Sequence, residues 1–160
     1  MRTPSPYRSL PAARRVEIVT HAVKSSREAR AFWIQRLAQR GGGFRPATLQ
    51  SWQPERLARE IVRLNAETAP DELELLHLLY VEMEPAIQAA FLEEAGVPHE
   101  NGRMPDDLEP PFASEEAVRR AAVAVNTSHG DEGMRYLRTL ARYATEAWPG
   151  IEGVVAELDS

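Results

Sequence analysis

The sequence predicts an all-α protein, folded as a compact single-domain bundle of six or seven helices. Two observations support this fold class. Apolar residues recur at spacings of three and four along most of the 160 residues, which is the period of helices that bury one face. Runs that alternate apolar and polar residues, as half-buried strands do, are absent from the sequence.

The first half of the chain is expected to contain three helices behind a flexible arm. The arm covers residues 1–9, and helices are predicted over 11–23, 26–40 and 54–65, with a short turn at 46–51. Pro11 and Pro54 favour the first turn of a helix. The N–H groups of that turn have no acceptor within the helix, so a proline there removes no hydrogen bond. The glycine triplet 41–43 is expected to end the second helix, because glycine accepts the left-handed backbone of a helix C-cap. Phe32 and Trp33 lie on the apolar stripe of that helix and are expected in the core.

The second half is expected to pack around a central helix near 71–84. Apolar residues such as Leu73 occur on every side of it, which is typical of a helix buried by neighbours all round. Pro85 either kinks this helix or starts a new one, because proline donates no backbone hydrogen bond and crowds the preceding turn. Further helices are predicted over 85–95, from Ser114 onward and over 131–148, with a short final turn near 154–158. Residues 97–113 form a long, acidic, Pro-rich loop, and loops of this length are often functional or mobile.

The two halves of the chain carry opposite charge. Residues 1–65 hold 13 Arg or Lys against 4 Asp or Glu, whereas residues 66–160 hold 6 against 20. Three arrangements explain such a split: the acidic half folds against the basic half, the faces of two copies meet, or one face meets a charged partner. Complementary charge steers association and excludes wrong partners more than it adds affinity.

Arginine stripes are the strongest candidate for a binding surface. The stripes lie along the second and third predicted helices. The candidate residues for binding protein or nucleic acid are Arg27, Arg30, Arg56, Arg59 and Arg63. Stripes of this kind can neutralise phosphates. Trp33 and Trp52 could then stack on bases, although Trp33 belongs to an apolar stripe and the rest of the chain would repel a polyanion.

No catalytic residue, metal ligand or cofactor is predicted, because no motif supports one. The sequence lacks a Gly-x-Ser-x-Gly element, and the glycine triplet lacks the Lys-Ser/Thr of a phosphate loop. If a small-molecule site exists, four residues on loops or helix ends are its candidates, since functional groups concentrate there. They are His99, Glu100, Asn101 and His129.

A metal site is the weakest of the alternatives. Glu74 and His77 have the Glu-x-x-His spacing of carboxylate-bridged di-iron helices, but such sites need a second copy and two further carboxylates. No second copy is present. A histidine at the edge of the core is therefore the favoured interpretation of His77.

The leading hypothesis is a small soluble protein that binds another protein, or itself, as an adaptor or regulator. Nucleic-acid binding through the arginine stripes is the alternative, and a metal-binding or enzymatic helical domain is the second alternative. The chain has no Cys and a single Lys beside its many Arg, which indicates a reducing cytoplasm and a GC-rich bacterial genome. No apolar stretch is long enough for a membrane span, so no membrane partner is expected.

Overall fold

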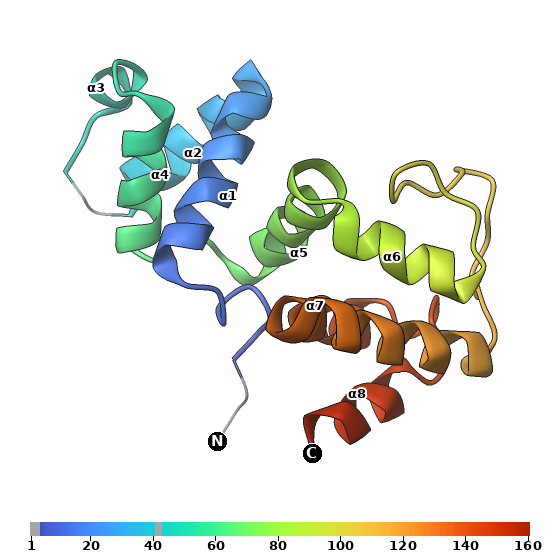
Figure 1. The fold of residues 1–160 in the computed structure, drawn as a ribbon. Coiled ribbons are helices and arrows are strands. Elements are labelled where there is room, and N and C mark those ends of the chain that lie inside the picture. Colours follow the sequence, from blue (N-terminus) through green and yellow to red (C-terminus); the bar gives the residue numbers. More distant parts are fainter. Residues whose placement is uncertain (1–3, 41–42) are drawn as a thin grey trace. The chain divides into compact units, whose positions relative to one another are not determined.

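Helices make up all of the regular structure in the computed structural model, which describes residues 4–40 and 43–160. This part of the chain holds eight α-helices and one π-helical segment, η1: α1 (Ala12–Ser25), α2 (Arg27–Gln39), α3 (Pro46–Gln50), α4 (Pro54–Arg63), α5 (Ala69–His77), η1 (Leu78–Met83), α6 (Ala86–Ala95), α7 (Glu115–Tyr143) and α8 (Ile151–Asp159) (Figure 1). The all-α prediction is confirmed. The proposed helix stop at Gly41 and Gly42 lies outside the described residues.

Contacts divide the chain into two compact units, Met1–Leu78 and Leu79–Ser160. The boundary falls within η1. That the whole chain is one domain stays a prediction.

The first unit is built on the packing of α1 against α4, and α2 packs against α1, α3 and α4 (Figure 1). Its core is filled by fully buried aliphatic side chains, among them Ile18, Leu37, Leu57 and Ile61. Trp33 is buried as predicted, but Phe32 on the same helix is 47% exposed. The expectation that Phe32 faces the core is therefore wrong.

Residues 4–10 belong to the folded part of the first unit. Tyr7 is fully buried and Leu10 is nearly so. The backbone N–H of Ser9 donates to the carbonyl of Ser5 over 2.9 Å, which closes a turn. Residues 4–9 therefore do not form the predicted flexible arm, and residues 1–3 lie outside the described part.

The segment predicted as a central helix changes its winding midway. It is α-helical only as far as His77, and the π-helical turn η1 takes its place before Pro85. The N–H of Glu84 donates to the carbonyl of Leu79 over 2.7 Å, a bond one residue longer than an α-helix makes. Pro85 offers no N–H and crowds the turn before it, so the regular helix does not continue. Leu73 is 47% exposed, so α5 is not buried on every side as expected.

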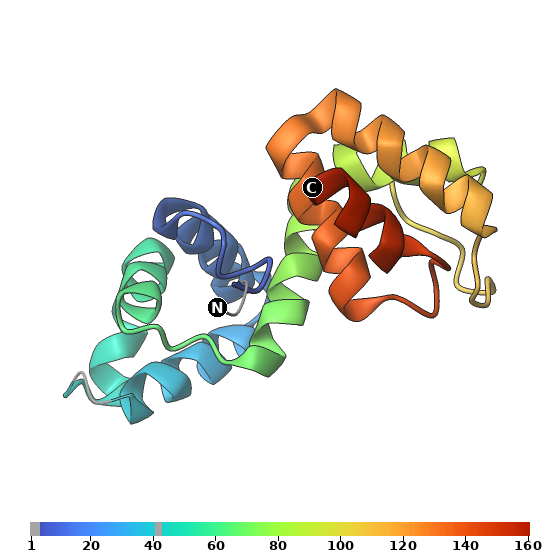
Figure 2. The same cartoon turned by 90° about the horizontal axis from the view of Figure 1, so that it is seen from below.

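The second unit consists of α6 and α8 packed on α7 (Figures 1 and 2). Aromatic rings fill its interior, with the ring of Phe91 meeting those of Tyr136 and Trp148 edge to face at centroid distances of 5.7 and 4.9 Å. The predicted break at Gly130 is a kink inside α7, where the backbone has φ 55° and ψ −132°. The bend is visible in the orange helix of Figure 2.

Two other boundaries in the second unit match the prediction, whereas α7 ends at Tyr143 and not at residue 148 as expected. The side chain of Ser114 caps α7 by accepting from the N–H of Ala117, as its place before two glutamates predicts. Gly96 ends α6 in the left-handed conformation at φ 74°. The C-terminal segment is a nine-residue helix, α8, rather than a short turn. Within the described residues, no helix has the length and apolar character that crossing a membrane requires.

Candidate functional site

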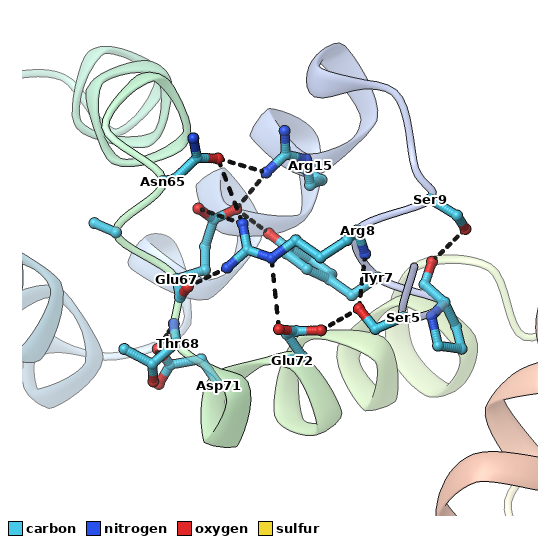
Figure 3. A network of polar contacts seen from close by, with 12 residues as sticks. Ser5, Tyr7, Arg8, Ser9, Arg15, Asn65, Glu67, Thr68, Asp71 and Glu72 are labelled. Atoms are coloured by element: carbon cyan, nitrogen blue, oxygen red, sulfur yellow. Dashed lines mark hydrogen bonds and ion pairs between the residues drawn. The ribbon is translucent and has the colours of Figure 1, made fainter. Parts of the chain in front are cut away.

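A buried carboxylate, Glu67, shows how part of the charge asymmetry is resolved. Its side chain is fully buried in the first unit. The hydroxyl of Tyr7 donates to its Oε2 over 2.5 Å, and Nη1 of Arg15 donates to the same oxygen over 3.4 Å. Arg8 lies between Glu67 and Glu72, with its Nη1 3.7 Å from Oε1 of Glu67 and its Nε 3.5 Å from Oε2 of Glu72 (Figure 3). Arginines from the basic half thus neutralise the first acids of the acidic half.

Burial is the main reason why the pKa of Tyr7 lies far above its ordinary value. The hydrogen bond to Glu67 and the negative charge of that carboxylate raise it further, against the opposing charges of Arg15 and Arg8. Tyr7 is therefore a neutral hydrogen-bond donor, and it ties the N-terminal residues to the connection between α4 and α5.

Asp71 fixes the start of α5 and binds a second arginine. Its Oδ2 accepts from the backbone N–H of Thr68 over 2.6 Å, completing a capping box. Nη1 of Arg36 donates to the same oxygen over 2.5 Å and to the carbonyl of Ala66 over 2.9 Å. Burial tends to raise the pKa of Asp71, but the hydrogen bonds from Arg36 and Thr68 outweigh it and lower that pKa. Arg36 is therefore part of the architecture rather than of an open surface.

The arginines of α2 and α4 converge around Trp52, in the turn between α3 and α4. Nη2 of Arg30 donates to the carbonyls of Gln50 and Trp52 over 2.9 and 2.8 Å. The guanidinium of Arg56 stacks on the indole ring of Trp52, 3.9 Å from its centroid. Arg27 lies one helical turn before Arg30 and so shares its side of α2. The two stripes predicted from sequence thus meet at one tryptophan.

The acids on α4 are already paired. Glu55 lies 3.6 Å from the ammonium of Lys24, and Glu60 accepts from Nε of Arg63 over 2.9 Å. Bonding to its own backbone N–H and the nearby Lys24 lower the pKa of Glu55, and the bond from Arg63 lowers that of Glu60. Arg63 therefore forms its ion pair within α4, with Glu60.

Arg56 and Arg59, like Arg27, are exposed and form no ion pair among the described residues. Sequence reasoning missed Arg45, which is exposed in the same way and also forms no ion pair in the described ranges. It follows Phe44, whose ring meets that of Trp52 edge to face at 4.7 Å. Arg45 lies outside the regular helical spacing, so no stripe pointed to it. We call Arg27, Arg45, Arg56 and Arg59, with Arg30 between them at Trp52, the basic face.

Stacking of bases on the two tryptophans is ruled out by their burial. Trp33 is 5% exposed and Trp52 is 8% exposed. One face of Trp52 is covered by Arg56, and its edge meets Phe44. Trp52 therefore packs under the arginines of the basic face, and its ring is not accessible to a ligand.

Three of the four loop candidates build a tight turn. Glu100 and Arg103 pair through two backbone hydrogen bonds of 2.8 and 3.0 Å, across Asn101 and Gly102, which both have positive φ. Nδ1 of His99 accepts from the N–H of Gly102 over 3.0 Å, and its Nε2 lies 2.9 Å from Glu93. Asn-Gly favours such two-residue turns because both positions need left-handed backbone. His99 and Asn101 therefore have a structural role in this turn, His99 as a hydrogen-bond acceptor and Asn101 as a residue with positive φ.

The remaining histidines do not join them. His129 lies on α7, one residue before the kink, and no hydrogen bond or ion pair of its side chain occurs in the part of the chain that the structure describes. His77 ends α5, and Glu74 lies one turn before it. Over residues 4–40 and 43–160, no three His, Asp or Glu side chains gather in a way that could hold a metal ion.

Comparison with known proteins adds no relative: no protein family, no curated protein and no solved structure matches this chain. The function is therefore argued from its residues alone.

Proposed function

We propose that this protein binds an acidic surface of another protein through the basic face. The observation that carries the proposal is the selective pairing of charges on the first unit. Lys24 and Arg63 engage the acids of α4, and Arg8, Arg15 and Arg36 engage the buried acids. Arg27, Arg45, Arg56 and Arg59 of the basic face form no ion pair among the described residues. An external carboxylate can therefore bind them, and arginine binds a carboxylate through two parallel hydrogen bonds.

The charge of the two units favours a protein partner over a nucleic acid. Residues 1–78 hold 13 Arg or Lys against 8 Asp or Glu, and residues 79–160 hold 6 against 16. The second unit therefore carries a net negative charge, which repels a polyanion. A partner with a bounded acidic patch meets the arginines without that repulsion, and the polarised surface steers its approach.

The same proposal gives the protein an adaptor or regulatory role in the cytoplasm. The lack of cysteine in the sequence fits a reducing compartment. The strong preference for Arg over Lys in the sequence supports a bacterial origin as part of the proposal.

Charge reversal with a matched control tests the proposal. Arg27, Arg56 and Arg59 are changed together to Glu. The control changes Arg40, Arg103 and Arg142 to Glu, which are exposed and form no ion pair among the described residues. Both variants have the same net charge, so a difference between them reports position. Partners retained by the wild-type protein at low salt are identified and purified, and their dissociation constants are measured by calorimetry.

We expect the basic-face variant to bind at least about 100-fold more weakly, because like charges facing one another across an interface cost several kcal/mol. The control variant should retain the wild-type affinity. Equal affinities of the two variants for every purified partner would refute the proposal. A titration with double- and single-stranded DNA at 50 mM salt tests the alternative of nucleic-acid binding. Tight binding with a steep salt dependence would favour a nucleic acid as the partner.

A further inference from the structure

A groove on the first unit lies between α1, α2 and α5 and uses none of the residues of the basic face. Its volume is about 430 Å³, within the range of small-molecule sites. The walls are mostly apolar and come from Ala22, Ala29, Phe32, Trp33, Leu75 and Leu78. Ser25, Glu74 and His77 supply the polar part of the lining.

Phe32 is the unusual member of the wall. It is 47% exposed although it is a large aromatic residue in the middle of a helix. The same ring already faces a cation on one side, because the guanidinium carbon of Arg36 lies 5.0 Å from its centroid. The guanidinium of Arg36 is itself hydrogen-bonded to Asp71 and to the carbonyl of Ala66.

Glu74 gives the groove its charge. It lies on the exposed side of α5, one turn before His77, and forms no hydrogen bond or ion pair within the described ranges. The hydroxyl of Ser25, by contrast, donates to the carbonyl of Ala22 over 2.7 Å and is already used. Glu74 is therefore the one acid among the lining residues, beside the imidazole of His77, and its unpaired carboxylate favours a ligand of positive charge.

We propose that this groove binds a small organic cation, with its apolar body against Phe32, Leu75 and Leu78 and its ammonium group at the Glu74 carboxylate. A neutral apolar ligand would take water from the carboxylate without replacing it. An anion would be repelled. A cation pairs with the carboxylate and is also attracted by the aromatic ring beside it.

Three probes of the same length test the charge preference: hexylammonium, 1-hexanol and hexanoate. Binding is followed by NMR through the indole N–H signals of the tryptophans. Trp33 lines the groove, whereas Trp52 and Trp148 do not, so only the Trp33 signal should move. We expect hexylammonium to bind about 10-fold more tightly than 1-hexanol, and hexanoate to bind more weakly than either.

Two variants locate the origin of that preference. Glu74→Gln should bring the affinity for hexylammonium down to that for 1-hexanol and leave 1-hexanol unaffected. Glu152→Gln, an exposed glutamate on α8, should change neither affinity. The proposal is overturned if the alcohol and the ammonium bind equally or if Glu74→Gln keeps the preference. It is also overturned if the Trp33 signal shifts with protein concentration alone, since a second copy would then occupy the groove.

Discussion

Replacing Tyr7 with phenylalanine tests the buried network that anchors the N-terminal residues. The change removes one oxygen and keeps a ring that is fully buried. Tyr7 makes the shortest hydrogen bond to the Glu67 carboxylate, at 2.5 Å, while Arg15 donates to the same Oε2 over 3.4 Å. The other oxygen, Oε1, accepts no hydrogen bond among the described residues. The substitution therefore leaves a buried carboxylate with only its weaker contacts.

A hydrogen bond to a charged group contributes about 1.5–3 kcal/mol. With a urea dependence of about 1.5 kcal/mol per molar, the unfolding midpoint should fall by about 1–2 M with an unchanged slope. Far-UV circular dichroism and tryptophan fluorescence give the midpoint. Tyr143→Phe is the control, because its hydroxyl makes no hydrogen bond in the described part of the protein. A midpoint shift no larger for Tyr7→Phe than for Tyr143→Phe would refute the assigned role of the network.

Alkaline pH provides a second measurement on the same residue. The pKa of Tyr7 in the folded protein is raised, chiefly by burial, above an unfolded value of about 10. Its neutral form therefore contributes stability that is fully present below pH 10 and is lost as the pH rises beyond it, because the unfolded chain releases the proton more readily. Stability should fall less steeply above pH 10 in Tyr7→Phe than in the wild type. Buried Tyr136 also has a pKa raised by burial. It is present in both proteins, so its loss of stabilisation at alkaline pH is the same in each and does not affect the comparison.

The remaining predictions concern the start of α5 and the kink of α7. Asp71→Asn should lower the unfolding free energy by about 1.5–3 kcal/mol at pH 7, because the charged partner of Arg36 is lost. The lowered pKa of Asp71 means that its contribution is present above pH 4 and is lost as the pH falls through the folded value, so the difference between the two proteins in urea titrations should shrink progressively below pH 4. Gly133→Ala should cost about 1–3 kcal/mol, since an added Cβ would lie 2.6 Å from the carbonyl oxygen of Val125. Gly153→Ala, with no atom within 4 Å of the new Cβ, should instead stabilise α8 by about 0.5–1 kcal/mol, and thermal melts of both variants check the contrast.

Local signals were sufficient for most of the helices. The serine cap at Ser114, the glycine at Gly96 and the prolines at the starts of α3 and α4 each act within one helical turn. The loop of 97–113 followed from its prolines and charges, and its Asn101-Gly102 turn shows why those residues occur there. Such features are readable because their cause and effect lie a few residues apart.

Exposure was harder to predict than helicity. Phe32 and Leu73 satisfy a helical apolar pattern and are nevertheless about half exposed. The pattern indicates which side of a helix is apolar, but it does not say how far the neighbouring helices extend over it. The groove could not be predicted for the same reason, since its walls come from α1, α2, α5 and the first residue of η1.

For the candidate site, the sequence by itself determined the residue types and their helical spacing. It placed Arg56, Arg59 and Arg63 on one helix and the excess of positive charge in the first 65 residues. Only the tertiary structure decided which charges are free. Arg8 reaches Glu67 across 59 positions of sequence, whereas Arg63 turns to Glu60 on its own helix. Pairing depends on distances between side chains far apart in the chain, so the division between structural arginines and the basic face required the fold.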